Sequence, residues 1–254
     1  MDYLTFAFFG VLVLSFVMEA VDSSVGMMYG TILSPLLIGF GFDPKDIVPA
    51  LVLSQAVGGI VASFQHHKFK NADFSWKSKD LKVAAIIFFL GVLAVIGGVF
   101  LGVKINKFAL SLYIAILMTV MGIIVLFGFR FKFKWNRILL IGIVSSFNKA
   151  LSGGGFGPIV TSGQVITGRS SKRSVGATTM SEVEICLASF IAWALIKNRL
   201  PDMALLVSLC AGAAFGGVLG PYLLSKIPQN KWFVRSLGIF AIASGVFALI
   251  EILT

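Results

Sequence analysis

The chain has 254 residues, of which 57% are hydrophobic and only 13% are charged. Soluble domains average about 25% charged residues, so this composition, with a mean hydropathy of +0.96, excludes an ordinary soluble protein and indicates an integral membrane protein. The net charge of +10 suggests a nucleic-acid partner, but the basic residues lie in short segments between apolar runs. We therefore interpret them as topology signals and expect no binding of nucleic acid.

Apolar runs recur along the whole chain, several of them close to the roughly 20 residues that cross a hydrocarbon core about 30 Å thick. The first half contains a broken pair and then three longer runs, at Leu4–Val21, Val25–Phe40, Ile47–Phe64, Leu81–Val103 and Phe108–Phe129. The second half repeats this order, at Ile138–Leu151, Phe156–Thr167, Val175–Ile196, Pro201–Leu224 and Trp232–Leu253. This pattern predicts an all-α, polytopic transmembrane helix bundle built from two repeats.

The halves divide the chain into an N-terminal repeat at 1–129, a basic cytoplasmic linker at 130–137 and a C-terminal repeat at 138–254. They also align locally, since Val25-Gly26 falls on Phe156-Gly157 and Ser54-Gln55 falls on Ser181-Glu182. The similarity is weak residue by residue, but its order is consistent.

Lysine and arginine are enriched on the cytoplasmic side of membrane proteins, so their distribution indicates how the chain is oriented in the membrane. If each broken pair is a hairpin that enters and leaves on one side, fifteen basic residues share one face: Lys68, Lys70, Lys77, Lys79, Lys82, Arg130, Lys132, Lys134, Arg137, Arg169, Lys172, Arg173, Lys226, Lys231 and Arg235. The other face receives five: Lys45, Lys104, Lys107, Lys197 and Arg199. This predicts inverted repeats and a multi-pass protein of a prokaryotic plasma or inner membrane, with both chain ends outside.

The two breaks are the first candidate for a functional site. Unwound backbone at membrane depth survives only where it is buried in protein or lines a cavity, and paired breaks in two halves point to a transporter site. The second break, Ser152 to Gly157, is rich in glycine, and a helix N-terminus there would offer free amides to an anion. The alternative is that the small residues only allow close helix packing.

Ionisable residues within the apolar runs are the second candidate, because such groups are costly in a membrane and mark ion or substrate pathways. Lys149 stands beside the glycine-rich break and is a candidate anion ligand, with a structural pair to Glu19 or Asp22 as the alternative. Glu182 is a candidate proton carrier.

The expected substrate-binding residues are Ser23, Ser24, Gly26, Lys149, Ser152, Gly153, Gly154, Gly155, Gly157 and Thr161, and the expected coupling-ion residues are Glu19, Asp22 and Glu182. We expect no catalytic residues, metal or cofactor, because no nucleophile–base pair or metal-ligand spacing is present. Cys186 and Cys210 lie in apolar runs, and we interpret His66 and His67 as a solvated surface pair. The four tryptophans lie mostly near the ends of runs, as interface anchors do.

The segment Leu151-Ser-Gly-Gly-Gly-Phe-Gly-Pro-Ile-Val, followed by Thr161-Ser162-Gly163 and by Ser174-Val-Gly-Ala-Thr-Thr, resembles the sulfite exporter TauE/SafE family. The first break departs from that family, whose members often have glycines where this chain has Glu19, Asp22, Ser23 and Ser24. The resemblance implies a permease for small sulfur-containing anions such as sulfite, sulfoacetate or other organosulfonates.

From this we expect a secondary transporter that works by alternating access around a site between the breaks and is ion-coupled. A passive anion channel is the alternative. The expected partners are a small anionic substrate and the lipid bilayer, and a homodimer is compatible with the sequence.

Overall fold

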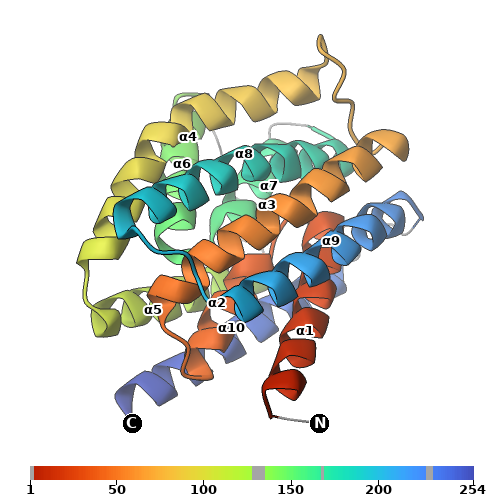
Figure 1. The fold of residues 1–254 in the computed structure, drawn as a ribbon. Helices are drawn as coiled ribbons and strands as arrows, with labels where there is room; N and C mark the ends of the chain where they lie inside the picture. Colours follow the sequence, from red (N-terminus) through yellow and green to blue (C-terminus); the bar gives the residue numbers. More distant parts are fainter. Residues whose placement is uncertain (1–2, 128–134, 167–168, 227–230) are drawn as a thin grey trace.

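The computed structural model describes residues 3–127, 135–166, 169–226 and 231–254, and all regular elements in these ranges are α-helices (Figure 1). The first five are α1 (Tyr3–Val25), α2 (Tyr29–Gly39), α3 (Pro44–Lys68), α4 (Lys79–Lys104) and α5 (Lys107–Phe127). The last five are α6 (Trp135–Ser152), α7 (Phe156–Ile166), α8 (Ser171–Lys197), α9 (Met203–Lys226) and α10 (Lys231–Leu253). The predicted all-α fold is confirmed.

Six of the described helices, α1, α3, α4, α5, α8 and α9, are long and apolar enough to cross a membrane. Their outer surfaces are apolar as well: Phe89, Leu93 and Leu195 are 72%, 77% and 75% exposed. Exposed apolar side chains on this scale suit contact with lipid rather than water. Together these helices make the chain a multi-pass membrane protein.

Corresponding helices of the two halves have corresponding neighbours. Helix α1 packs along α9, as α6 packs along α4, and α3 contacts α9 as α8 contacts α4. The pairs α3 with α8 and α5 with α10 join the two halves. Two related halves would give this correspondence, while their inverted orientation stays a prediction.

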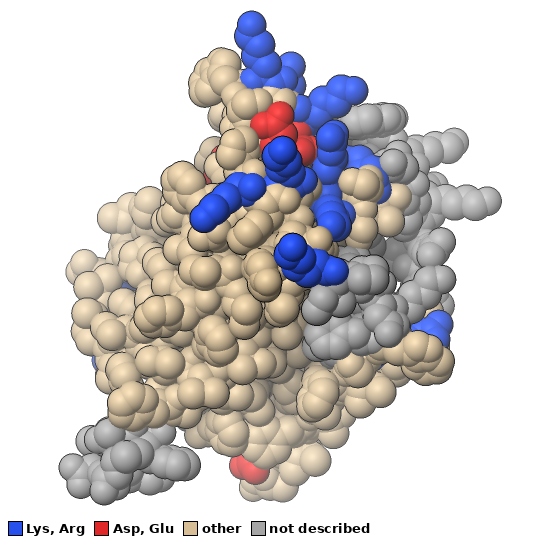
Figure 2. Space-filling view, turned by 90° about the vertical axis from the view of Figure 1, so that its right-hand side faces the viewer, with Lys and Arg blue, Asp and Glu red and all other residues tan. Residues whose placement is uncertain are grey.

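Three of the basic segments come together at one end of the molecule. Arg169 pairs with Asp80, Asn71 Nδ2 donates to the Pro221 carbonyl (2.8 Å), and Lys172 Nζ donates to the Ser225 carbonyl (3.1 Å). These contacts join the α3–α4 connection, the start of α8 and the end of α9. Figure 2 shows the resulting concentration of lysine and arginine above a broad surface with few charged side chains.

At a different place on the molecule, the start of α3 meets the ends of α4 and α8. Lys197 Nζ donates to Asp46 Oδ1 (2.6 Å), and Lys45 Nζ donates to the Val103 carbonyl (2.7 Å). The start of α1 and the end of α10 both lie at the bottom of the view in Figure 1. Which side faces the cytoplasm stays a prediction. Linker residues 130–134, loop residues 227–230 and the run ends Phe129 and Thr167 lie outside the described residues, whereas residues 135–137 belong to α6.

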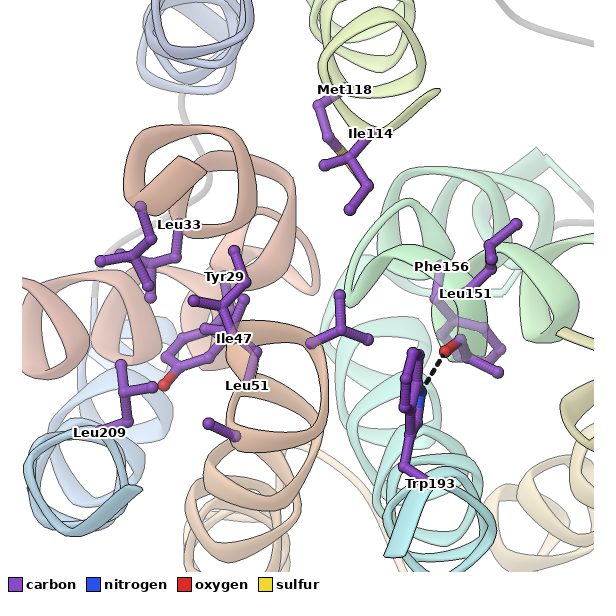
Figure 3. Close-up of a cluster of buried hydrophobic side chains, with 14 of the residues drawn as sticks. Tyr29, Leu33, Ile47, Leu51, Ile114, Met118, Leu151, Phe156, Trp193 and Leu209 are labelled. Atoms are coloured by element: carbon purple, nitrogen blue, oxygen red, sulfur yellow. Dashed lines mark hydrogen bonds between the residues drawn. The ribbon is translucent and has the colours of Figure 1, made fainter. Parts of the chain in front are cut away.

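Large side chains fill the interior between the helices, including Tyr29, Leu51 and Phe156 (Figure 3). Trp193 is fully buried there and donates from Nε1 to the Ala150 carbonyl (2.8 Å), so it is not an interface anchor. A glycine in α4 explains this burial, because Gly102 leaves room for the indole ring. Trp76 and Trp232 are 89% and 74% exposed, as anchors would be.

Candidate functional site

The first helix break lies later in the chain than the sequence predicts. Helix α1 continues to Val25, so Asp22, Ser23 and Ser24 belong to its last turns. The serine hydroxyls donate back into the helix, from Ser23 to the Glu19 carbonyl (2.6 Å) and from Ser24 to the Val21 carbonyl (2.8 Å). Small polar residues satisfied in this way need not end a helix.

The chain reverses instead at Gly26 and Met28, which both have positive φ, of 80° and 113°. Glycine adopts this backbone readily, whereas a residue with a side chain does so only when the surrounding structure holds it there. Met28 is 1% exposed and packs with Val25 and Ile32. Its conformation is therefore held by packing, which the composition of the segment does not reveal.

The second break lies where the sequence predicts it, between Ser152 at the end of α6 and Phe156 at the start of α7. Gly153 and Gly155 have φ values of 76° and 80°, in the left-handed region that glycine favours. The Ser152 hydroxyl donates to the Asn148 carbonyl (2.6 Å), and the Gly154 amide lies 3.3 Å from that hydroxyl.

The two breaks contact each other directly, backbone against backbone. A Cβ atom on Gly30 would overlap the Gly153 carbonyl oxygen, and one on Gly157 would overlap the Gly26 carbonyl oxygen. Side chains close the crossing: Thr161 Oγ1 donates to the Gly26 carbonyl (2.7 Å). The glycines thus serve close packing in this structure, and their role in substrate binding stays a prediction.

A cluster of buried polar side chains lies beside this crossing. Lys149 Nζ is 2.8 Å from Glu182 Oε1, with the two side chains 1% and 6% exposed. The same ammonium donates to Gln55 Oε1, and Gln55 Nε2 is 3.4 Å from Asp22 Oδ2. The four residues Asp22, Gln55, Lys149 and Glu182, which we call the polar cluster, come from α1, α3, α6 and α8.

Asp22 also connects the polar cluster to the first break. Its Oδ1 atom accepts from the amide of Tyr29 (2.9 Å), the first residue of α2, whose N-cap residue Met28 offers no side-chain acceptor. A carboxylate at this position satisfies a free amide and complements the positive end of the helix. The Tyr29 hydroxyl in turn bonds Ser15 (2.9 Å) and Ser54 (2.7 Å).

Lys149 pairs with neither Glu19 nor Asp22, the two acids that the sequence offered as partners in a structural ion pair. Its partner is Glu182, because α6 and α8 both contact α4 and lie side by side. Glu19 is buried beside Gly58 of α3 and Gly216 of α9, and its Oε2 atom has no hydrogen-bond partner among the described residues. Glu19 therefore lies outside the hydrogen-bonded polar cluster.

Sequence reasoning missed several residues of this region. Gln55 was considered only as the counterpart of Glu182, yet both residues bond Lys149. The alignment of the two halves was the available signal. Thr178 bonds Thr161 Oγ1 (3.0 Å), but it entered the sequence analysis only as part of the Ser174-Val-Gly-Ala-Thr-Thr segment. Ser34, which donates to the Ser152 carbonyl (2.6 Å), gave no signal of its own.

The structure also corrects the reading of the histidine pair. His66 is fully buried rather than exposed, with Asn71 Nδ2 3.2 Å from its Nδ1 atom, whereas His67 is exposed. The α3–α4 connection folds over His66, and Gly176 of α8 leaves room beside it. Within the described part of the chain no group of three potential ligands forms a metal site, and Cys186 and Cys210 are both free.

These features define a class: a polytopic helical membrane protein with two crossing helix breaks and a buried ion pair next to them. Residues 11–248 match the family model described as "Sulfite exporter TauE/SafE", so the chain belongs to this family. It is 28% identical over 243 residues to a Bacillus subtilis (strain 168) protein described as "Probable membrane transporter protein YtnM", covering 89% of this chain and 76% of that protein. No solved structure matches the chain. The chain is therefore a membrane transporter of the TauE/SafE type and not an enzyme.

Proposed function

We propose that this transporter moves small sulfur-containing anions, such as sulfite, sulfoacetate or other organosulfonates, by alternating access around a site between the two breaks. The observation that carries the proposal is the buried ammonium group of Lys149, one turn before the glycines of the second break. The description of the family supports a sulfur oxyanion as the substrate.

The partners of Lys149 support binding of an anion at this point. A buried ammonium group is costly unless it is paired and hydrogen-bonded, and here its partners are the oxygen atoms of Glu182 and Gln55. A sulfite or sulfonate oxygen offers the same kind of acceptor. An arriving anion can therefore take the place of the Glu182 carboxylate without leaving the lysine unpaired.

The same exchange supports coupling to protons. The negative charge of Glu182 would repel an anion bound to Lys149, and a protonated Glu182 would not. Entry of one proton with one singly charged anion, such as a sulfonate or hydrogen sulfite, thus keeps the charge of the polar cluster constant. Asp22, linked to Lys149 through Gln55, and Glu19 are further candidates for taking up a proton or cation.

Binding of sulfite to the protein in nanodiscs, measured by titration calorimetry, tests the site. We expect Lys149→Ala to weaken sulfite binding at least tenfold. The matched control is Lys197→Ala, since Lys197 also pairs with a carboxylate, Asp46, but is 16% exposed and far from the breaks in sequence. Equal sulfite affinity in Lys149→Ala and wild type would show that the proposed site is wrong.

A passive anion channel is the alternative, and the direct contact between the breaks bears on it. Backbone against backbone leaves no room for an anion between Gly30 and Gly153, so a channel would have to open this contact. Counterflow separates the two functions: preloaded sulfite accelerates uptake of labelled sulfite by a transporter, while a channel conducts large currents without saturation.

A further inference from the structure

A second candidate binding site lies at the basic end of the molecule, away from the polar cluster. A surface pocket of about 290 Å³ lies between the α3–α4 connection and the first turn of α8. Its lining residues are His67, Lys70, Ala72, Asp73 and Arg173. We call it the basic pocket.

Buried polar residues hold the two sides of the basic pocket together. The Asp80 carboxylate is 2% exposed, accepts from the amide of Asp73 (2.8 Å) and pairs with Arg169, which precedes α8. Asn71 is 1% exposed and bonds the Pro221 carbonyl of α9 (2.8 Å). The pocket is thus built on a fixed frame and does not depend on a loose surface loop.

The backbone at Lys70 is part of this frame. Lys70 has a φ of 57°, a left-handed conformation that is unfavourable for a residue with a side chain. The turn is held by the amide of Lys70, which donates to the His67 carbonyl (3.1 Å), and by that of Asn71, which donates to the His66 carbonyl (2.9 Å). Strain of this kind persists only where the surrounding structure holds it, and it is common at binding sites.

The charges of the basic pocket are unbalanced. Asp80 neutralises Arg169, but neither Lys70 nor Arg173 has a carboxylate within 4.0 Å among the described residues. The opposing charge is Asp73, whose pKa is lowered first by the Ser75 amide, 2.9 Å from its Oδ1, so that it stays ionised at neutral pH. One net positive charge remains when His67 is neutral.

His67 supplies a further donor. The Phe74 amide donates to its Nδ1 atom (3.1 Å), so the neutral ring carries its proton on Nε2. The lining therefore combines a guanidinium, an ammonium and an imidazole N–H, the donors that proteins use for phosphate-type groups.

The surroundings resemble a membrane interface. Trp76 and Phe64, on the α3–α4 connection and the end of α3, are 89% and 75% exposed, and Lys77 and Lys79 are exposed close by. Exposed tryptophan beside clustered lysine is typical of the region of lipid headgroups. Figure 2 shows the blue residues gathered at this end of the molecule, directly next to a surface with few charged side chains.

We propose that the basic pocket binds a phosphate-type oxyanion through Lys70, Arg173 and His67. The group can come from the headgroup of an anionic phospholipid or from a free ion, and the position at the interface favours the headgroup. Asp73, whose Oδ1 lies 3.8 Å from Nδ1 of His67, weakens the binding by its charge.

The test uses the full chain in nanodiscs of phosphatidylcholine with and without phosphatidylglycerol. Native mass spectrometry counts the phosphatidylglycerol retained, and calorimetry in phosphatidylcholine alone titrates inorganic phosphate. We expect Lys70→Gln/Arg173→Gln to lower the affinity for one of these probes at least tenfold and Asp73→Asn to raise it several-fold. Lys77→Gln, a change on the same connection outside the pocket lining, is the matched control and should change neither.

If the double variant retains less phosphatidylglycerol, the bound oxyanion is a lipid headgroup. If it loses saturable binding of inorganic phosphate, the bound oxyanion is the free ion. Both results support the pocket. Wild-type affinity for both probes in the double variant, or no gain in Asp73→Asn, would overturn it. Both readouts measure binding outside the polar cluster, so they are independent of the proposed transport activity.

Discussion

The ammonium nitrogen of Lys149 lies 2.8 Å from Oε1 of Glu182, and the two side chains are 1% and 6% exposed. The residues belong to α6 and α8, so this ion pair joins two helices inside the membrane region. Breaking a buried pair by removing one partner leaves an uncompensated charge, which costs about 3–5 kcal/mol in soluble proteins. The pair thus links the stability of the protein to the group that we propose binds the anion.

Lys149→Ala should therefore destabilise the protein by about 3–5 kcal/mol, because Glu182 stays buried without its partner. Thermal unfolding in detergent measures this change. The double variant Lys149→Met/Glu182→Leu should regain most of the stability, because it removes both charges, but it should not regain sulfite binding. Recovery of sulfite binding in the double variant would contradict our assignment of Lys149.

The partly exposed pair of Lys197 and Asp46 provides the control for this measurement. Its side chains are 16% and 30% exposed, and pairs in contact with solvent contribute about 0–1 kcal/mol. Lys197→Ala should therefore have a small effect on unfolding. If Lys149→Ala destabilises the protein no more than Lys197→Ala does, the buried pair contributes no more to stability than the partly exposed pair.

Glu182→Gln should separate anion transport from the proton gradient. In wild type, an inwardly directed proton gradient should accelerate sulfite uptake into proteoliposomes, since protonation of Glu182 releases Lys149 for the anion. The amide cannot take up a proton, so uptake by the variant should no longer respond to the gradient. Glu251→Gln, an exposed acid in α10, should keep the wild-type response.

If Glu182→Gln responds to the proton gradient as wild type does, we would assign the proton-binding role to Asp22 or Glu19 instead. If sulfite flux in wild type changes with neither the proton gradient nor the sodium gradient, the proposal of ion coupling is wrong.

Gly30→Ala should disturb the crossing of the two breaks. The added Cβ atom would overlap the Gly153 carbonyl oxygen, a backbone atom that cannot move without shifting the second break. We expect destabilisation of about 1–3 kcal/mol, the usual cost of overpacking a tight interior, together with loss of transport. Thermal unfolding and sulfite flux measure both effects.

Gly97→Ala is the matched change, because a Cβ atom there meets only Phe147 at ordinary contact distance, 3.9 Å. Alanine within a helix should be neutral or slightly stabilising at this position. Wild-type transport by Gly30→Ala would mean that the breaks do not need to meet closely.

Asp22→Ala should weaken the start of α2, because the Tyr29 amide loses its acceptor (2.9 Å). Removal of a capping side chain costs about 0.5–2 kcal/mol. Asp22→Asn keeps an oxygen acceptor at the same place and should retain most of the stability, although it removes the charge. Hydrogen exchange at the amides of α2 would report the difference, and equal protection in both variants would contradict the capping role.

The sequence predicts features that depend on local backbone conformation better than features that depend on contacts between distant residues. The second break was predictable because Gly153 and Gly155 adopt backbone angles that few other residues do. The first break was placed too early because Ser23 and Ser24 look like breakers but bond within their own helix. Its actual turn at Met28 is held by packing, which a single sequence does not show.

The sequence did not identify the partner of Lys149 either, because that contact also depends on packing between helices. Several acids lie in the membrane runs, among them Glu19, Asp22, Glu182 and Glu184, and the choice among them depends on which helices are neighbours. Only the weak alignment of Gln55 with Glu182 placed the two residues in related positions, and both bond the lysine.

Trp193 offers a test of how the surroundings of Lys149 position it. Its Nε1 atom donates to the carbonyl of Ala150 (2.8 Å), the residue that follows Lys149 in α6, and this holds the last turn of the helix before the glycine-rich break. Trp193→Phe removes the donor and leaves that carbonyl without it, at a cost of about 1–3 kcal/mol. We expect a several-fold loss of sulfite affinity in addition, because the helix end that carries Lys149 is less well fixed. Trp232→Phe, at a tryptophan that is 74% exposed, is the control and should leave calorimetric sulfite binding unchanged. Unchanged affinity in Trp193→Phe together with the loss of stability would restrict this tryptophan to packing and remove it from the positioning of Lys149.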